Sequence, residues 1–214
     1  MARRYASFAG IVLCLLLALG GQALADGLVP DASGAATNQA VGQAASSYLT
    51  GIKTFAAAVL WNRIDNLVDN YYSGVSLNDQ RYMLTTIAVV QELDPKAVPS
   101  YYVGSWLLAN NDRLEDGLAM AERGVEANPD AGVLRVSLAQ LLQLYTDDMD
   151  RAVELAESAL SDDMAWDDSI QQANGYLTAR AVFEAAGRDD LAETAQAMAD
   201  AVVIDPADIH EHDE

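Results

Sequence analysis

Proline follows an acidic or amide residue at three places in the chain: Asp94-Pro95, Asn128-Pro129 and Asp205-Pro206. Pro129 follows Pro95 by 34 residues, and Pro206 follows Pro129 by 77, which is two such periods plus 9 residues. A repeat of about 34 residues is typical of arrays of helical hairpins. This period constrains the fold strongly, because a single hairpin cannot bury its apolar face and needs neighbours stacked against it.

The apolar residues after Ser47 have the spacing of helices. Between Tyr48 and Ile64 they recur every three to five residues, as one face of a helix requires. This first helix is predicted to run from Ser47 to Tyr72 and to stop near Gly74. We find no segment of strict apolar and polar alternation between turn signals, so the sequence predicts no strand.

The residues before the prolines indicate where hairpins begin. Asp94 and Asn128 can accept hydrogen bonds from the free N–H groups of a helix start, and a following proline suits the first helical turn. Each dipeptide is therefore expected to end one hairpin and begin the next. The polar turns that are expected to join the two helices of a hairpin are Asn110-Asn111-Asp112, Thr146-Asp147-Asp148 and Gly187-Arg188-Asp189.

Two glycines and a longer segment add detail to this expectation. Gly117 and Gly124 lie on one face of a predicted helix. Glycine inside a helix costs about 1 kcal/mol relative to alanine, so this face is expected to meet another helix closely. The extra 9 residues fall within 161–172, where Asp167 or Asp168 is expected to cap the next helix and Trp166 to fold back as a plug.

These features resemble the tetratricopeptide repeat family, whose 34-residue unit has small residues at repeat positions 8, 20 and 27 and proline at position 32. With Pro129 at position 32, the small positions hold Ser105, Gly117 and Gly124. The resemblance covers about residues 60–206 and is weakest in the first unit, where Met83 and Val90 replace small residues. It implies an all-α fold, a right-handed superhelix of about four helical hairpins.

The resemblance also implies a binding surface. In the family, the first helix of each hairpin faces a concave groove that holds a segment of a partner. The positions of this chain that match the groove positions, and are therefore partner-binding candidates, include Asp65, Tyr72, Tyr102, Trp106, Gln140, Gln143 and Leu177. Aromatic side chains are enriched where binding energy concentrates, but aromatic residues at helical spacing also commonly fill a core. In the adjacent pairs Tyr71-Tyr72 and Tyr101-Tyr102, one ring is expected in the core and the other at the surface.

The N-terminal residues have the order of a secretory signal peptide. Two arginines precede an apolar run from Phe8 to Gly20, and Ala23-Leu24-Ala25 supplies the small residues that signal peptidase requires. Residues 1–25 are thus predicted to be a signal peptide cleaved after Ala25, which makes the protein exported, periplasmic or extracellular. The alternative is an uncleaved membrane anchor, although the run is shorter than the about 20 apolar residues that span a bilayer.

The rest of the chain divides by composition. Residues 26–46 are rich in Ala, Gly, Ser, Asn and Gln and are predicted to be a flexible linker. Residues 47–206 form the expected repeat domain, and residues 207–214 an acidic tail that contains histidine.

Composition excludes several classes of function. The 12 basic and 32 acidic residues leave a net charge of −20, which disfavours binding to nucleic acid. This charge promotes solubility or attracts a basic partner. Cys14 lies in the predicted signal peptide, and both histidines, His210 and His212, lie in the tail. Nucleophile systems that need histidine or cysteine are therefore not expected, and we predict no enzyme activity, cofactor or metal.

The sequence favours an exported scaffold that binds an unknown protein or peptide and serves the assembly of an envelope or secreted complex. One alternative is a membrane-anchored assembly factor, which requires the N-terminal segment to stay uncleaved. Another is a weak metal-binding protein through the His-x-His tail, or an enzyme that uses a pair of carboxylates. Self-association is a further expectation, because no helix is predicted to cover the last hairpin after Pro206.

The predicted cleavage can be tested directly. N-terminal sequencing of the protein recovered from the periplasm or the medium is expected to begin at Asp26. Membrane-bound material that begins at Met1 or Ala2 would instead support the anchored alternative.

Overall fold

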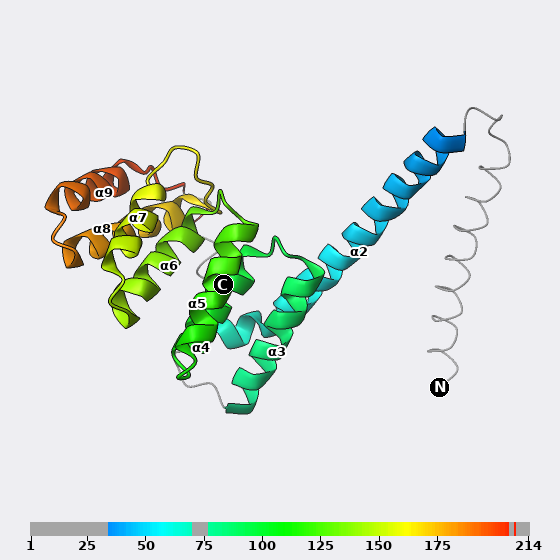
Figure 1. The fold of residues 1–214 in the computed structure, drawn as a ribbon, viewed down its shortest axis with the longest axis horizontal. Helices are drawn as coiled ribbons and strands as arrows, with labels where there is room; N and C mark the ends of the chain where they lie inside the picture. Colours follow the sequence, from blue (N-terminus) through cyan, green and yellow to red (C-terminus); the bar gives the residue numbers. More distant parts are fainter. Residues whose placement is uncertain (1–33, 70–76, 206–207, 209–214) are drawn as a thin grey trace. The chain divides into compact units, whose positions relative to one another are not determined.

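A computed structural model describes residues 34–69, 77–205 and 208. The regular structure of these residues is helical and contains no strand; Ala131 and Ala165 form an isolated bridge. The helices are α2 (Gly34–Asp69), α3 (Leu77–Leu93), α4 (Val98–Ala109), α5 (Leu114–Ala127), α6 (Gly132–Tyr145), α7 (Met149–Ser158), α8 (Ser169–Ala185) and α9 (Asp189–Ala201) (Figure 1). The expected all-α class is confirmed for this part of the chain.

The chain divides into two compact units, residues 1–51 and 52–214. The first half of α2 is the described part of the first unit. The second unit contains the rest of α2 and the helices α3 to α9.

Helices of the second unit pack as pairs that follow the chain. α4 packs on α5, α6 on α7 and α8 on α9, and each pair is joined by one of the polar turns expected from the sequence (Figure 1). The first helices of successive hairpins also touch: α4 packs against α6, and α6 against α8. Ile64 of α2 and Met83 of α3 belong to one buried cluster, and residues 70–76, which join these helices in the sequence, lie outside the described residues.

The dipeptides Asp94-Pro95 and Asn128-Pro129 do not begin helices as the sequence suggested. α4 starts at Val98 and α6 at Gly132, three residues beyond Pro95 and Pro129. The backbone N–H of Ala97 donates to the carbonyl of Asp94 at 3.1 Å, and Ala131 donates to Asn128 at the same distance. These are β-turns with proline at the second position, where its fixed φ is favoured. The expected N-caps are therefore turn residues between hairpins.

Asn128 has a further role at the end of α5. Its side chain is buried, and its amide Nδ2 donates to the carbonyl of Gly124 at 3.2 Å. The backbone N–H of Asn128 donates to the same carbonyl at 2.9 Å. The residue thus satisfies the open C-terminal end of the preceding helix instead of the start of the next one.

Small residues set the distance between helices α4 and α5. A Cβ added to Gly117 would lie 2.7 Å from the backbone oxygen of Ser105, and one added to Gly124 would lie 2.7 Å from the Cβ of Tyr101. Both distances are shorter than a carbon atom allows, so the close approach expected from the sequence is confirmed. The later hairpins use alanine in the same way, with Ala139, Ala152, Ala156, Ala179 and Ala195 fully buried in one core cluster.

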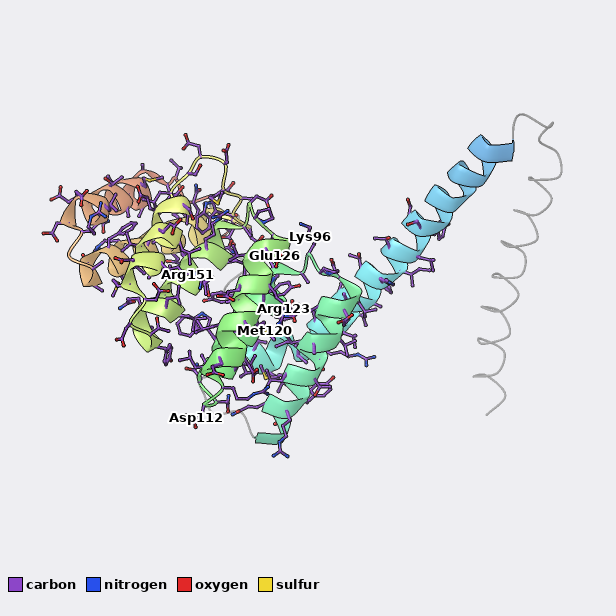
Figure 2. All side chains as sticks on the ribbon, in the orientation of Figure 1. Lys96, Asp112, Met120, Arg123, Glu126 and Arg151 are labelled. Atoms are coloured by element: carbon purple, nitrogen blue, oxygen red, sulfur yellow. The ribbon has the colours of Figure 1, made fainter. Side chains whose placement is uncertain are left out.

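Charged side chains lie mainly on the outer faces of the helices. Figure 2 labels Arg123 and Glu126 on α5 and Arg151 on α7. The guanidinium of Arg151 forms an ion pair with Glu122 at 2.8 Å, which connects α7 to α5. Because both side chains are about half exposed, solvent screening limits the contribution of this pair to stability.

The N-terminal part of α2 differs from expectation. The sequence predicted a flexible linker over residues 26–46 and a first helix from Ser47, whereas α2 already begins at Gly34. The five alanines between residues 34 and 46 favour helix, and no proline interrupts them. The predicted signal peptide (1–25) and most of the tail (207–214) lie outside the described residues. Among the helices that are described, none has the length and apolar character needed to cross a membrane.

The helix contact at Gly117 leads to a stability prediction. Gly117→Ala should lower the free energy of unfolding by about 1–2 kcal/mol, because overpacking outweighs the better helix propensity of alanine. The measurement is urea unfolding followed by circular dichroism. Gly51→Ala is the control, since no atom lies within 4 Å of its added Cβ. Equal stability of the Gly117 variant and the original protein would contradict the close contact.

Candidate functional site

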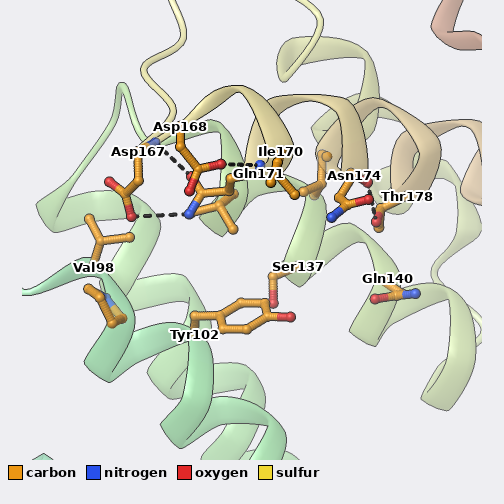
Figure 3. A pocket seen from close by; sticks show the side chains of 14 residues that line it. Val98, Tyr102, Ser137, Gln140, Asp167, Asp168, Ile170, Gln171, Asn174 and Thr178 are labelled. Atoms are coloured by element: carbon orange, nitrogen blue, oxygen red, sulfur yellow. Dashed lines mark hydrogen bonds between the residues drawn. The ribbon is translucent and has the colours of Figure 1, made fainter. Parts of the chain in front are cut away.

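A hollow of about 280 Å³ lies on the first helices of the three hairpins. Figure 3 shows its labelled residues coming from α4, α6 and α8 and from the two aspartates that precede α8. Its lining consists of Val98, Pro99, Tyr102, Val133, Val136, Ser137, Gln140, Asp167, Asp168, Ile170, Gln171, Asn174, Gly175 and Thr178. The hollow therefore joins residues that are up to 80 positions apart in the chain.

The lining combines apolar and polar side chains. Val136 is buried, whereas Val98, Val133 and Ile170 are half-buried and offer apolar surface. Hydroxyl and amide groups of Tyr102, Ser137, Gln140, Gln171, Asn174 and Thr178 stand among them. Such a surface can contact apolar side chains while its amides bond to the backbone of a bound chain.

Tyr101 and Tyr102 point in different directions, as expected from their adjacent positions on a helix. Tyr101 is buried against Gly124, and this burial raises the pKa of its phenol. Tyr102 is 42% exposed and lines the hollow. The prediction of one core ring and one surface ring is confirmed for this pair. The pair Tyr71-Tyr72 lies outside the described residues.

Trp106 is not among the lining residues of the hollow, but it bonds to one of them, Ser137. It is half-buried against the core, and its indole Nε1 donates to the Oγ of Ser137 at 2.8 Å. Its ring meets Tyr145 edge to face, with centroids 6.4 Å apart. The phenol of Tyr145 donates to the Oδ1 of Asn110 at 3.0 Å. Of the two expectations for Trp106, the structure favours a packing position that holds α4 against α6.

The other sequence candidates are placed as follows. Gln140 lines the hollow together with Tyr102. Gln143 is half-buried and Leu177 is 40% exposed, but neither belongs to the lining. Tyr72 and the side chain of Asp65 lie outside the described residues.

Residues at the start of α8 were missed by the sequence candidates. Asp168 caps this helix, because its Oδ1 accepts from the backbone N–H of Gln171 at 2.6 Å. Asp167 pairs with the side chain of Gln171 in both directions, at 3.0 and 3.1 Å. Gln171 and Asn174 lie 34 residues after Ser137 and Gln140, so the repeat period could have found them. The expectation that Asp167 or Asp168 caps this helix is confirmed for Asp168.

Trp166 packs between α6 and α8, which agrees with the expectation that it folds back as a plug. Its ring lies against Gly132 and Gly175, where an added Cβ would come within 2.4 and 2.2 Å of ring atoms. It also meets Tyr176 edge to face, with centroids 5.5 Å apart. The neighbouring Ala165 exchanges backbone hydrogen bonds with the turn before α6. The loop is thereby fixed between α6 and α8 and holds Asp167 at the hollow.

The described residues contain no group of three or more His, Cys, Asp or Glu side chains placed to hold a metal ion. His210 and His212 lie outside the described residues, so the tail alternative is not tested. No model of a known protein family matches the chain, and a search of curated proteins found no match.

The plug leads to a second prediction. Trp166→Ala should lower the free energy of unfolding by about 2–3 kcal/mol, because it opens a cavity between α6 and α8. Trp166→Phe should cost only about 1 kcal/mol, since the buried indole N–H has no hydrogen-bond partner to lose. Chemical denaturation of both variants measures the difference. Equal losses would show that ring packing is not what the loop contributes.

Proposed function

We propose that the protein is a binding scaffold that holds a segment of another protein in the hollow across α4, α6 and α8. We further propose that its hairpins continue as a right-handed superhelix of the tetratricopeptide type, with this hollow on the concave side. Stacked hairpins of this kind characteristically bind partners on their concave faces.

One observation carries the proposal: the lining comes from the first helices of three consecutive hairpins. These helices pack in sequence, α4 on α6 and α6 on α8. A surface that continues over successive repeats suits an elongated ligand better than a small molecule. An extended chain or a helix has this shape.

The chemistry of the lining supports a protein ligand. Apolar contacts are available from Val98, Val133 and Ile170, and backbone groups of a bound chain can pair with the amides of Gln140 and Asn174. The lining contains no His, Cys or Lys that could act with Ser137 in nucleophilic catalysis. We therefore propose binding rather than catalysis at this site.

The hollow is supported by fixed contacts, which favours affinity. The Trp106–Ser137 hydrogen bond holds one wall, and the Trp166 plug holds the loop at the other. A preformed site loses little conformational entropy when a ligand binds. Together with the signal-peptide pattern of residues 1–25, we propose that this binding occurs outside the cytoplasm.

A displayed library of random short peptides, selected on the full-length chain, tests the binding function. Peptides that are retained should lose about tenfold in affinity on a Tyr102→Ala, Gln140→Ala variant, which corresponds to about 1.4 kcal/mol. Both residues are at least partly exposed, so the variant should stay folded.

Leu144→Ala is the matched control, because Leu144 is 53% exposed on α6 and lies outside the lining. The measurement is fluorescence anisotropy with labelled synthetic copies of the retained peptides. If the double variant and the control bind them equally, the hollow is not the binding site.

A further inference from the structure

We infer that the hollow selects protein segments in which a lysine or arginine stands next to apolar residues. This inference rests on the proposed binding function and specifies the chemistry of the partner. It follows from the distribution of charge and apolar surface in the lining.

The charged residues of the lining are both acidic. They are Asp167 and Asp168, which lie at the N-terminus of α8 (Figure 3). No Lys or Arg is among the lining residues. An acidic ligand would therefore meet like charge there, whereas a basic side chain would meet opposite charge. Charge complementarity of this kind favours one class of partner and excludes the other.

The two carboxylates are not equivalent. Asp168 caps α8, so the N-terminal N–H groups and helix dipole already offset its charge. Asp167 is exposed, and its side chain bonds to the neutral amide of Gln171. A carboxylate accepts several hydrogen bonds, so Asp167 can accept from a ligand cation as well as from Gln171.

A second hollow adjoins the first at Asp167. It shares Val98, Val133, Asp167 and Gln171 with the first and adds Asp130. Lys96 also lines it, but its Nζ donates to the backbone carbonyl of Ala127 at the C-terminal end of α5. Acidic side chains therefore outnumber basic ones over both hollows.

Apolar surface lies beside these carboxylates. Val133 and Ile170 are half-buried and Val136 is buried, and all three line the same hollow as Asp167. A ligand that carries only charge would leave this surface uncovered. A segment with a basic residue followed by apolar ones covers both parts, and the stem of a lysine or arginine adds apolar contact of its own.

The peptides selected on the full-length chain provide the test. Retained sequences should be enriched in Lys and Arg next to apolar residues. Their affinity should fall about fivefold to tenfold with Asp167→Asn, and further with Asp167→Lys.

The control separates a local effect from the general attraction of basic peptides to a chain of net charge −20. Asp162→Lys makes the same change of charge in the same loop, outside the lining of both hollows. It should change affinity by less than about twofold.

Each outcome is informative. Enrichment of acidic or uncharged peptides that still depend on Tyr102 and Gln140 would overturn this inference and leave the binding function intact. Equal losses with Asp167→Lys and Asp162→Lys would overturn it as well, because the attraction would then be nonspecific. If no retained peptide depends on Tyr102 and Gln140, the proposed binding function fails, and this inference fails with it.

Discussion

Close packing of helix backbones at small residues is the constraint on which the rest of this structure depends. At Gly117 the backbone of α4 occupies the space that a Cβ would need. At Gly132 and Gly175 the Trp166 ring does the same. Fully buried alanines such as Ala139 and Ala156 continue this pattern in the later hairpins. At these contacts the hairpins are held together by shape complementarity between closely approaching surfaces.

The hollow is a consequence of this packing. When the first helices of successive hairpins stack directly, their outer residues form one continuous surface. Trp106 and Trp166 strengthen this arrangement from two sides, the first through Ser137 and the second through the loop before α8. The same loop brings Asp167 to the hollow, so a packing element also determines the charge of the proposed binding surface.

Sequence reasoning was most accurate where one physical explanation fits the residues. Two glycines on one helix face have little reason to be there except close packing, and Gly117 and Gly124 confirm this. It was least accurate where two explanations fit equally. An Asp or Asn before proline suits a helix start and a β-turn alike, and only the hydrogen bonds of Ala97 and Ala131 distinguish them. On α8 the sequence candidates named Leu177 and omitted Gln171 and Asn174, although these two lie 34 residues after Ser137 and Gln140.

The sequence by itself determined the helical class of the described residues, the three polar turns inside the hairpins and the division of the Tyr101-Tyr102 pair into one buried and one exposed ring. These properties depend on local spacing and local conformational preference, which a sequence records directly. Only the tertiary structure decided that Trp106 supports the hollow and that Gln171, Asn174 and Asp167 meet Tyr102 across it. Such contacts join distant segments, and they depend on the distances between helices that side-chain packing sets.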